Sequence, residues 1–289
     1  MNSDYSVRGT FQNLKVRFSL ADTTSLCADG IRIFDADPVA AEIFSAALTT
    51  AALLAPLLEG AEKYSCQWEY PGLLGKLLVD VNARADVRGI LNAPHLVSES
   101  LKADDIFGHN DGLMKVLKFD NGSIINSGST KAPLADIAAD AGFFFSTSDQ
   151  IETEFACAVR FNPDPANPVR RAAGLMLQAM PDCDLTAFDP VREQIKQKGF
   201  REILLEDLAP KQKLVKIAAA LSLAEPEFSY GPAPGFRCSC SHGKLLGSMK
   251  LLPAGDLAEI FSEKETVKVK CEFCRSEYVF DKSEFIKNG

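Results

Sequence analysis

The stretch Cys238-Ser239-Cys240 is followed, after thirty intervening residues, by Cys271-Glu272-Phe273-Cys274. These two pairs hold half of the eight cysteines in the chain. The thiolate is the form of cysteine that binds metal, and four thiolates that converge from two short turns make a closed tetrahedral zinc site. A CxC followed by a CxxC is a rarer spacing than two CxxC pairs, so it is the more informative. The spacing predicts a metal site built from these four cysteines.

The same cysteines allow a second chemistry, because each pair is close enough in the chain to close on itself as a disulfide. A thiol used in that way no longer binds metal. The ring closed by a CxxC is relaxed, whereas a CxC ring is small and strained and is therefore easier to reduce. From spacing alone, two interpretations remain open: a permanent structural zinc knuckle, or a redox switch built from the same ligands.

Composition indicates an ordinary soluble globular protein, with 46% hydrophobic and 24% charged residues. A chain of 289 residues is long enough for one sizeable core with one or two small modules. The net charge of −8 and the pI near 5.1 disfavour binding to nucleic acid or to an anionic membrane, since such binding normally needs a basic surface.

The N-terminus has no basic segment that leads into an apolar run, so the sequence predicts no secretory signal. The apolar stretch 39–58 raises the question of a membrane span. Glu42 and Pro56 interrupt it, and Asp37-Pro38 supplies the start of a soluble helix, so we expect a buried core helix. The predicted location is the cytoplasm, where cysteines serve metal or redox chemistry rather than a disulfide scaffold.

Residues 1–181 are expected to form an α+β core domain with a largely antiparallel sheet, because many strands mix with few helices and no regular βαβ alternation is present. Hydrophobic alternation predicts strands, and Asp120-Asn121-Gly122 predicts a hairpin turn. The predicted strands cover 14–20, 64–70, 73–81, 113–119, 123–126, 151–161 and 174–180. Helices are predicted for 38–60 and around 132–141.

Residues 182–232 are predicted to form a helical linker. Strand patterning ends there, and helices are expected over 189–198 and 211–223, broken into short pieces by Gly199 and by flanking prolines. Short isolated helices are marginal in water and need a partner surface. We therefore expect the linker to be ordered only while it is docked, with 230–236 as a hinge into the last module.

Residues 233–289 are predicted to form a small zinc-binding domain, with helices over 244–252 and 256–261, a hairpin around the CxxC, and a short helix capped by Asp281. Fifty-seven residues are too few to build a strong core alone. Structural zinc contributes roughly 10–16 kcal/mol of apparent folding free energy to small modules. Oxidation of the four ligands is therefore expected to unfold this domain.

The chain resembles the redox-regulated heat-shock holdase family, the bacterial thirty-three-kilodalton heat-shock proteins. The main match is residues 235–241, GFRCSCS, followed by residues 269–281, VKCEFCRSEYVFD. Residues 174–181, GLMLQAMP, resemble the segment at the end of the family's core domain, and residues 146–150, STSDQ, resemble its serine-acid-glutamine stretch. Residues 171–174, RAAG, lack the glycine richness of the family at that place.

The resemblance implies a cytosolic, ATP-independent chaperone that is inactive while reduced and bound to one Zn²⁺ per chain. Oxidation would form disulfides within the pairs Cys238–Cys240 and Cys271–Cys274 and release the zinc. The linker would then unfold, the protein would form a homodimer, and it would hold unfolded client proteins. The family uses no nucleotide and is not an enzyme, and no phosphate loop or hydrolase motif is visible here.

The other cysteines and the histidines are given structural roles. Cys66 and Cys157 are expected on the inward sides of strands, and Cys27 in an exposed loop. The aspartates on either side of Cys183 oppose its thiolate and argue against reactivity. His242 is a possible substitute for a sulfur ligand, but four cysteines already complete the set. His95 and His109 have no ligand or nucleophile near them in sequence.

Two rival functions remain beside the holdase. The first is a constitutive zinc-dependent protein-binding module without redox switching. The second is a thiol–disulfide oxidoreductase that uses Cys271 and Cys274; the strand expected on each side of this CxxC disfavours it, because such motifs normally open a helix in a βαβ unit.

Overall fold

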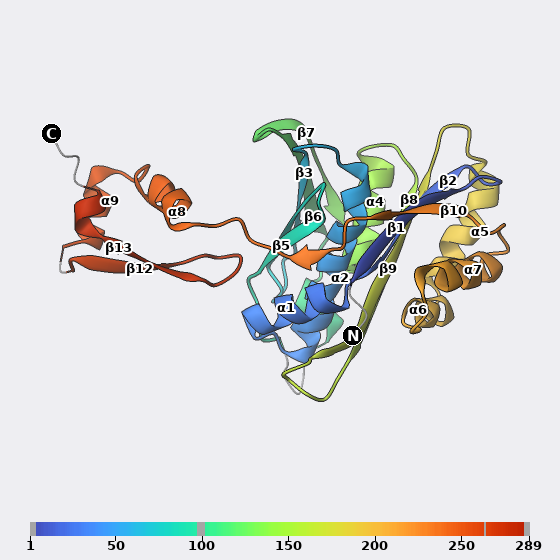
Figure 1. Ribbon diagram of the computed structural model, residues 1–289, viewed down its shortest axis with the longest axis horizontal. Coiled ribbons are helices and arrows are strands. Elements are labelled where there is room, and N and C mark those ends of the chain that lie inside the picture. Colours follow the sequence, from blue (N-terminus) through green and yellow to red (C-terminus); the bar gives the residue numbers. More distant parts are fainter. Residues whose placement is uncertain (1–3, 97–101, 263, 286–289) are drawn as a thin grey trace. The chain divides into compact units, whose positions relative to one another are not determined.

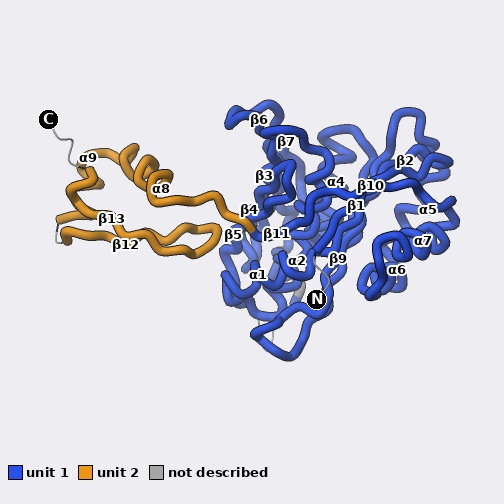
Figure 2. Tube along the Cα trace, in the orientation of Figure 1, with its two compact units in different colours: residues 1–236 blue, residues 237–289 orange. Residues whose placement is uncertain are grey.

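The computed structural model describes residues 4–96, 102–262 and 264–285. The chain divides into two compact units, Met1–Phe236 (unit 1) and Arg237–Gly289 (unit 2), which Figure 2 distinguishes by colour. Each unit is described by itself.

Unit 1 contains a five-stranded antiparallel sheet with the strand order β10-β1-β2-β9-β8. Its register pairs Val7 with Leu20, and Leu20 in turn with Leu175. The strands are β1 (Tyr5–Phe11), β2 (Val16–Asp22), β8 (Thr153–Phe161), β9 (Val169–Ala179) and β10 (Glu227–Gly231).

A second sheet of six strands has the order β11-β5-β4-β3-β6-β7 and is antiparallel except where β11 pairs with β5. The hairpin β6–β7 turns at Asn121 and Gly122, which both have positive φ, as the Asp-Asn-Gly sequence predicts. The strands are β3 (Lys63–Glu69), β4 (Lys76–Asn82), β5 (Asp86–Leu91), β6 (Gly112–Asp120), β7 (Ser123–Ala132) and β11 (Gly235–Phe236).

The helix α2 (Pro38–Leu54) lies between the two sheets, with α1 (Thr24–Phe34) and α4 (Ile137–Thr147) beside it (Figure 1). Asp37 caps α2 by accepting a hydrogen bond from the backbone N–H of Ala40, and Pro38 occupies its first turn. The segment Pro38–Leu57 is long and apolar enough to cross a membrane, yet 72% of its most apolar window is buried inside the protein. The expectation of a buried core helix is confirmed.

Gly174 in β9 allows this close packing. A Cβ atom at this position would lie 2.5 Å from Cγ2 of Thr49 on α2, so only glycine lets the strand approach the helix so closely. The remaining helix of this region is α3 (Ala103–Phe107).

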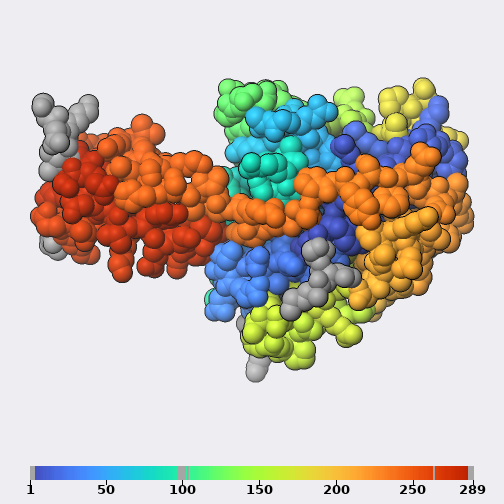
Figure 3. Space-filling view, viewed as in Figure 1, coloured from blue at the N-terminus to red at the C-terminus, as the bar shows by residue number. Residues whose placement is uncertain are grey.

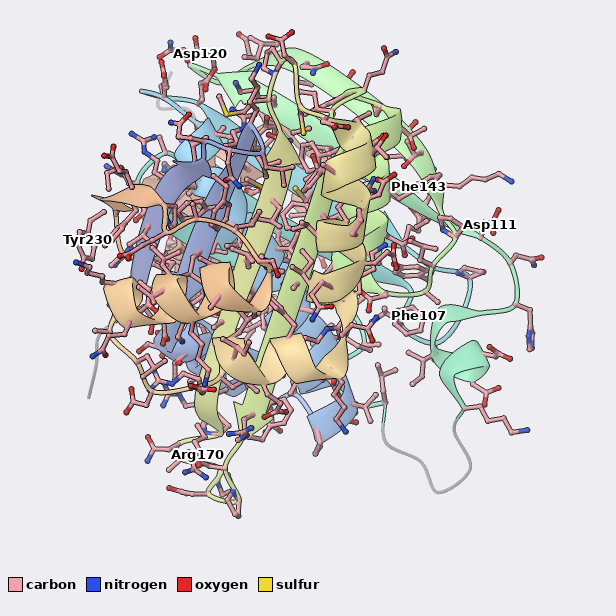
Figure 4. The ribbon with its side chains drawn as sticks, turned by 90° about the vertical axis from the view of Figure 1, so that its right-hand side faces the viewer. Phe107, Asp111, Asp120, Phe143, Arg170 and Tyr230 are labelled. Carbon is pink, nitrogen blue, oxygen red and sulfur yellow. The ribbon has the colours of Figure 1, made fainter. Side chains whose placement is uncertain are left out.

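The opposite face of the five-stranded sheet is covered by α5 (Leu185–Lys196), α6 (Lys198–Leu204) and α7 (Pro210–Ala220), which face the viewer in Figure 4. Their apolar residues form a second core with the sheet, and β9 is therefore buried on both faces. The buried linker residues include Phe188, Val191, Ile195, Phe200, Leu204, Leu214 and Ile217.

Ion pairs tie the rim of these helices to the sheet. Arg171 of β9 pairs with Asp22 of β2 and with Asp207, which follows α6. Arg160 of β8 pairs with Glu202 of α6. The interface between the predicted linker and the five-stranded sheet thus has apolar residues at its centre and ion pairs at its edge.

Unit 2 contains α8 (His242–Met249), α9 (Ala254–Ile260) and a two-stranded sheet of β12 (Thr266–Lys270) and β13 (Glu277–Asp281). Asp281 caps a short 3-10 turn over Lys282–Glu284 by accepting a hydrogen bond from the N–H of Ser283, as predicted.

The α+β class with antiparallel sheets is confirmed, and three local expectations are corrected. Cys27 lies in helix α1 and is fully buried, not in an exposed loop. The linker is broken into short helices as expected, but the break falls at Gln197, between α5 and α6, and Gly199 lies inside α6. The segment 230–236 is not a free hinge: Tyr230 belongs to β10, and Gly235 and Phe236 form β11. Figure 3 shows this part of the chain, in orange, running across the surface of unit 1.

Candidate metal centre

The tight turn between β12 and β13 holds the CxxC pair. The backbone N–H of Cys271 donates to the carbonyl of Ser276 at 2.9 Å, and the N–H of Arg275 donates back to the carbonyl of Cys271 at 2.9 Å. Arg275 takes a left-handed conformation with φ of 59°, which closes the turn. As a result, both sulfur atoms of the pair project from one short loop.

The CxC pair lies just before α8. Ser241 caps this helix by accepting a hydrogen bond from the N–H of Lys244, whose ammonium group in turn donates to the carbonyl of Ser239 at 2.6 Å. These bonds fix the backbone on both sides of Cys240, so the second pair of thiols is also held by local structure.

The four sulfur atoms converge in unit 2. Those of Cys238, Cys240, Cys271 and Cys274 all lie within 4.8 Å of one another. Between the pairs, Sγ of Cys238 lies 3.8 Å from Sγ of Cys271, and Sγ of Cys240 lies 3.3 Å from Sγ of Cys274. Four sulfurs at about 2.3 Å from a tetrahedral zinc ion stand roughly 3.8 Å apart. The donor set and its spacing therefore fit a soft metal ion, and these four residues are the ones that would hold it.

No disulfide joins any of the eight cysteines, all of which lie in described residues. Two of the clustered thiols, Cys240 and Cys274, differ in their pKa. Burial raises the pKa of Cys240 to about 12, although the hydrogen bond with Tyr278 acts to lower it. Burial also acts against ionisation of Cys274, but hydrogen bonds with Ser276 and with the neighbouring thiols lower its pKa to about 7. Cys274 therefore ionises more readily than Cys240, and the thiolate is the form of cysteine that binds metal and reacts with oxidants.

Two side chains that sequence reasoning missed contact the sulfur atoms. The hydroxyl of Tyr278 lies 3.2 Å from Sγ of Cys240, and the hydroxyl of Ser276 lies 3.3 Å from Sγ of Cys274. Tyr278 looked like an ordinary strand residue in the alternating pattern, and its position beside the CxC pair depends on the fold of the whole unit.

His242 is not part of the sulfur cluster. Its ring stacks on Phe280, with centroids 4.4 Å apart, and Nε2 lies 3.2 Å from the carbonyl of Val279 and 3.5 Å from a carboxylate oxygen of Glu284. His242 therefore contributes to the packing of unit 2.

The four remaining cysteines lie in unit 1, apart from the cluster. Cys27 and Cys66 are fully buried, and burial raises the pKa of both thiols. Burial also raises the pKa of Cys157, to about 12. Cys183 is half-buried, and its pKa is raised by burial and by Asp184. Raised pKa values make all four poor nucleophiles.

Fold and site together define a class: an α+β protein of two compact units, the smaller of which is built around four convergent thiols suited to a soft metal ion. The Hsp33 protein family matches residues 4–281, so the chain belongs to the Hsp33 family.

Relatives and a solved structure agree with this assignment. The chain is 28% identical over 283 residues to a 33 kDa chaperonin of Desulfotalea psychrophila, covering 96% of this chain and 94% of the relative. It is 27% identical over 287 residues to a 33 kDa chaperonin of Geobacillus kaustophilus, covering 97% and 96%. The crystal structure of the 33 kDa chaperonin from Thermotoga maritima has the same fold, with a TM-score of 0.82 at 21% identity over 98% of this chain and 97% of that one.

Proposed function

We propose that this protein is a redox-regulated, ATP-independent chaperone of the cytoplasm that holds unfolded client proteins under oxidative stress. In the reduced state Cys238, Cys240, Cys271 and Cys274 bind one Zn²⁺ and the protein is inactive. The convergence of these four sulfur atoms within 4.8 Å is the observation that supports the proposal best. Membership of a family whose relatives are named 33 kDa chaperonins supports the choice of activity.

The activating step is a four-electron oxidation. Cys271 and Cys274 react as one pair, and Cys238 and Cys240 react as the other. The sulfur of Cys274 attacks one oxygen of hydrogen peroxide and keeps it as a sulfenic acid, while the O–O bond breaks and the other oxygen leaves as hydroxide, which takes up a proton to form water. The sulfenic acid then condenses with the thiol of Cys271 to form a disulfide and a second water. A second peroxide converts Cys238 and Cys240 in the same way. Each disulfide removes two electrons and two metal ligands.

Loss of the metal is expected to unfold unit 2, because little else stabilises it. Its buried apolar side chains in the described residues are Met249, Phe261, Cys271 and Phe280. A metal contribution of roughly 10–16 kcal/mol exceeds what so small a core supplies.

The linker connects this event to client binding. Cys238 follows β11 by two residues in the chain, and β11 and β10 lead back to α7. In this scheme, unfolding of unit 2 frees the C-terminal end of this segment, β10 and β11 separate from β1 and β5, with which they pair in the folded protein, and the linker helices then leave the five-stranded sheet. Their apolar residues and the uncovered face of the sheet become the client-binding surface, and two activated copies associate as a homodimer. In this scheme 1–181 is the core domain, 182–232 the linker and 233–289 the redox domain.

No enzymatic step is needed, because the protein binds clients and does not transform them. Nor does the scheme use nucleotide, nucleic acid or a membrane. Unfolded proteins expose apolar side chains of many sequences, and a large apolar surface recognises them without a specific pocket.

The test compares two preparations in suppressing the aggregation of a heat-denatured client. One is reduced and zinc-loaded, and the other has been treated with peroxide at raised temperature while a chromogenic chelator reports the zinc released. We expect release of about one zinc per chain and the appearance of suppression after oxidation. A Cys183→Ser variant should behave as the parent, and a Cys274→Ser variant should bind zinc weakly.

Two results would reject the scheme. Full suppression by the reduced form, lost on oxidation, would show a constitutive zinc-dependent binding module. Catalytic reduction of insulin disulfides with turnover would show an oxidoreductase.

A further inference from the structure

Strand β10 covers one edge of the five-stranded sheet. It runs antiparallel to β1, with register pairs from Thr10–Glu227 to Ser6–Gly231, and Figure 1 shows it alongside that strand. Without β10, the edge of β1 would present a row of unpaired backbone N–H and C=O groups. The segment that follows the linker helices therefore acts as the cover of this edge.

Backbone pairing, more than buried side chains, attaches β10 to the sheet. None of its five residues is buried: Glu227, Ser229 and Tyr230 are exposed, and Phe228 and Gly231 are half-buried. Tyr230 is 67% exposed and lies at the outer edge of the sheet in Figure 4. In β2, by contrast, all but one of the residues are buried. A ladder of this kind recognises the backbone of an extended chain and makes little demand on its sequence.

Gly9 in β1 makes room for the strand that pairs with it. A Cβ atom at this position would lie 2.2 Å from the carbonyl oxygen of Glu227 and 2.8 Å from the ring of Phe18. Glycine inside a strand weakens it, and it often marks a place where another backbone approaches closely. The edge of β1 is thus shaped to accept a partner strand.

Two prolines limit how far β10 can pair. Pro226 precedes the strand and Pro232 follows it, and proline has no N–H to donate to a ladder. In contrast, β1 covers Tyr5–Phe11 and contains no proline. Its edge is therefore longer than the strand that covers it, and an extended chain without proline can form a longer ladder there than β10 does.

Undocking of the linker would weaken the hold on β10. Phe228, which lies opposite Gly9, packs against the core that contains Leu214 and Ile217 of α7 as well as residues of the sheet. When the helices leave, this core loses their side chains, and β10 keeps only its short ladder. Strand pairing without a packed face is marginally stable in water.

We propose that β10 occupies a site at which the activated protein binds its clients, and that an extended segment of an unfolded polypeptide takes the place of β10 along β1. The client backbone exchanges N–H···O=C hydrogen bonds with the edge of β1. An apolar side chain of the client lies over Gly9, where Phe228 lies in the resting protein. The resident strand blocks this site until the linker undocks.

This inference rests on the proposed function, because it places one client contact within that scheme. It adds a geometry that burial of apolar surface alone does not require. The client segment must be extended, and every second amide of it must face β1. A short peptide tests these requirements separately from the suppression of client aggregation.

The probe is a fluorescein-labelled peptide of residues 225–233 that carries Pro226→Thr and Pro232→Thr, so that it can form the longer ladder. Fluorescence anisotropy follows its binding to the full chain, both reduced with zinc bound and oxidised by peroxide at raised temperature. We expect saturable binding to the oxidised protein and binding at least about tenfold weaker to the reduced protein. The reason is that apparent affinity falls with the fraction of molecules whose edge is free.

Two N-methylated forms of the peptide test the ladder. One is methylated at the backbone nitrogens of Glu227, Ser229 and Gly231, and the other at those of Phe228 and Tyr230. In an antiparallel pair, alternate N–H groups of a strand face its neighbour and the others face away. One form should therefore bind about tenfold more weakly or worse, and the other should bind within about threefold of the unmethylated peptide. Equal loss in both forms, or no loss in either, would overturn the proposal.

Variants of the chain assign the site to β1. Phe228→Ala should strengthen peptide binding to the reduced protein about threefold to tenfold, because the resident strand is held less firmly. Ser229→Ala, at an exposed position of the same strand, should not change it. Gly9→Ala should weaken binding to the oxidised protein about tenfold or more, while circular dichroism and zinc release match the parent.

Hydrogen exchange locates the peptide on the oxidised protein. At saturation the peptide should slow exchange of those β1 amides that face the edge, whereas the amides of β7, an edge strand of the six-stranded sheet, should not change. Protection of β7 in place of β1 would overturn the proposal. An oxidised protein that suppresses aggregation but binds no peptide would refute this site and leave the proposed function intact. Absence of suppression would refute the proposed function, and this inference with it.

Discussion

Unit 1 and unit 2 obtain their stability in different ways. Unit 1 buries both faces of its five-stranded sheet, with α2 on one side and the linker helices on the other, and its two cores together extend through most of its elements. Unit 2 has a two-stranded sheet, two short helices and only a few buried apolar side chains in its described part. Unit 1 is stabilised by packing, whereas under the proposed function unit 2 would be stabilised mainly by a metal ion bound to its four thiols.

The linker helices lie between these extremes. They are too short to be stable in isolation, and their order comes from the sheet on which they pack. The comparison leads us to propose a gradient of conditional folding: a core that folds by itself, a linker that packs on the core, and a small unit that would need a metal ion. The predictions below test each level.

Removal of one ligand should have the largest effect. In zinc-loaded protein, Cys271→Ser is expected to cost most of the roughly 10–16 kcal/mol that a structural zinc site contributes. Amides of 237–285 should lose their hydrogen-exchange protection, while those of β8 and β9 keep theirs. Cys183→Ser is the control, and full protection of unit 2 in Cys271→Ser would refute its dependence on metal.

Truncation of a buried linker residue should come next. Phe188 is fully buried in the core shared by the linker and the sheet, so Phe188→Ala is expected to cost about 3–5 kcal/mol. In this variant, hydrogen exchange of the backbone amides should speed up more in α5–α7 than in β9. Val215→Ala, at a 41% exposed position on α7, should change little. Equal loss of protection in α5 and in β9 would contradict a separately undocking linker.

Overpacking inside unit 1 should have a smaller effect. Gly174→Ala places a methyl group 2.5 Å from Cγ2 of Thr49 and is expected to cost about 1–3 kcal/mol in a urea titration followed by Trp68 fluorescence. Thr49→Ser removes that methyl group and keeps the hydroxyl, so it should recover part of the loss. Gly199→Ala, in α6 with nothing within 4 Å of the new atom, should instead stabilise slightly.

A change of pH should produce the smallest effect. Lys213 of α7 is fully buried and donates to the carbonyl of Leu204 at 2.6 Å, and burial lowers its pKa from 10.5 to about 8. Between these two values the unfolded chain holds a proton that the folded protein has lost. The contribution of Lys213 to the free energy of unfolding should therefore rise with pH across this window, by at most about 1.4 kcal/mol per pH unit. Above about pH 9 the buried thiols Cys27, Cys66 and Cys157, whose pKa values are raised, contribute a slope of the opposite sign, so the Lys213 contribution is read as a difference between variants.

Two variants check this assignment. Lys213→Met should make the slope of the free energy of unfolding between pH 8 and 10.5 less positive than in the parent, and Lys211→Met, at an exposed position of the same helix, should leave the parent slope unchanged. The same slope in both would assign it to another group.

The sequence predicts those features that short stretches specify. The cysteine spacing identifies all four members of the cluster, because local turns bring each pair together. The hairpin at Asn121 and Gly122 follows from turn chemistry, and α2 from its cap at Asp37 and its apolar length.

The expectations that were wrong concern segments whose secondary structure depends on tertiary packing. Helix α1 begins without a side-chain cap and includes Gly30, so its sequence does not look helical. Gly30 is needed there because a Cβ atom would lie 2.7 Å from Leu48 on α2, and this packing also buries Cys27. Likewise β10 is a strand only because β1 offers it an edge, and no local pattern in 227–231 reveals that partner.

That pairing has a consequence for the order in which the protein is made. The hydroxyl of Ser6, in β1, donates to the carbonyl of Pro232, 226 positions later in the chain. During synthesis, β1 emerges from the ribosome early, whereas β10 emerges only when most of the chain has been made. Until then one edge of the five-stranded sheet has no neighbour, and unpaired edges are where nascent sheets associate wrongly. The polypeptide is thus itself in need of protection for most of its own synthesis.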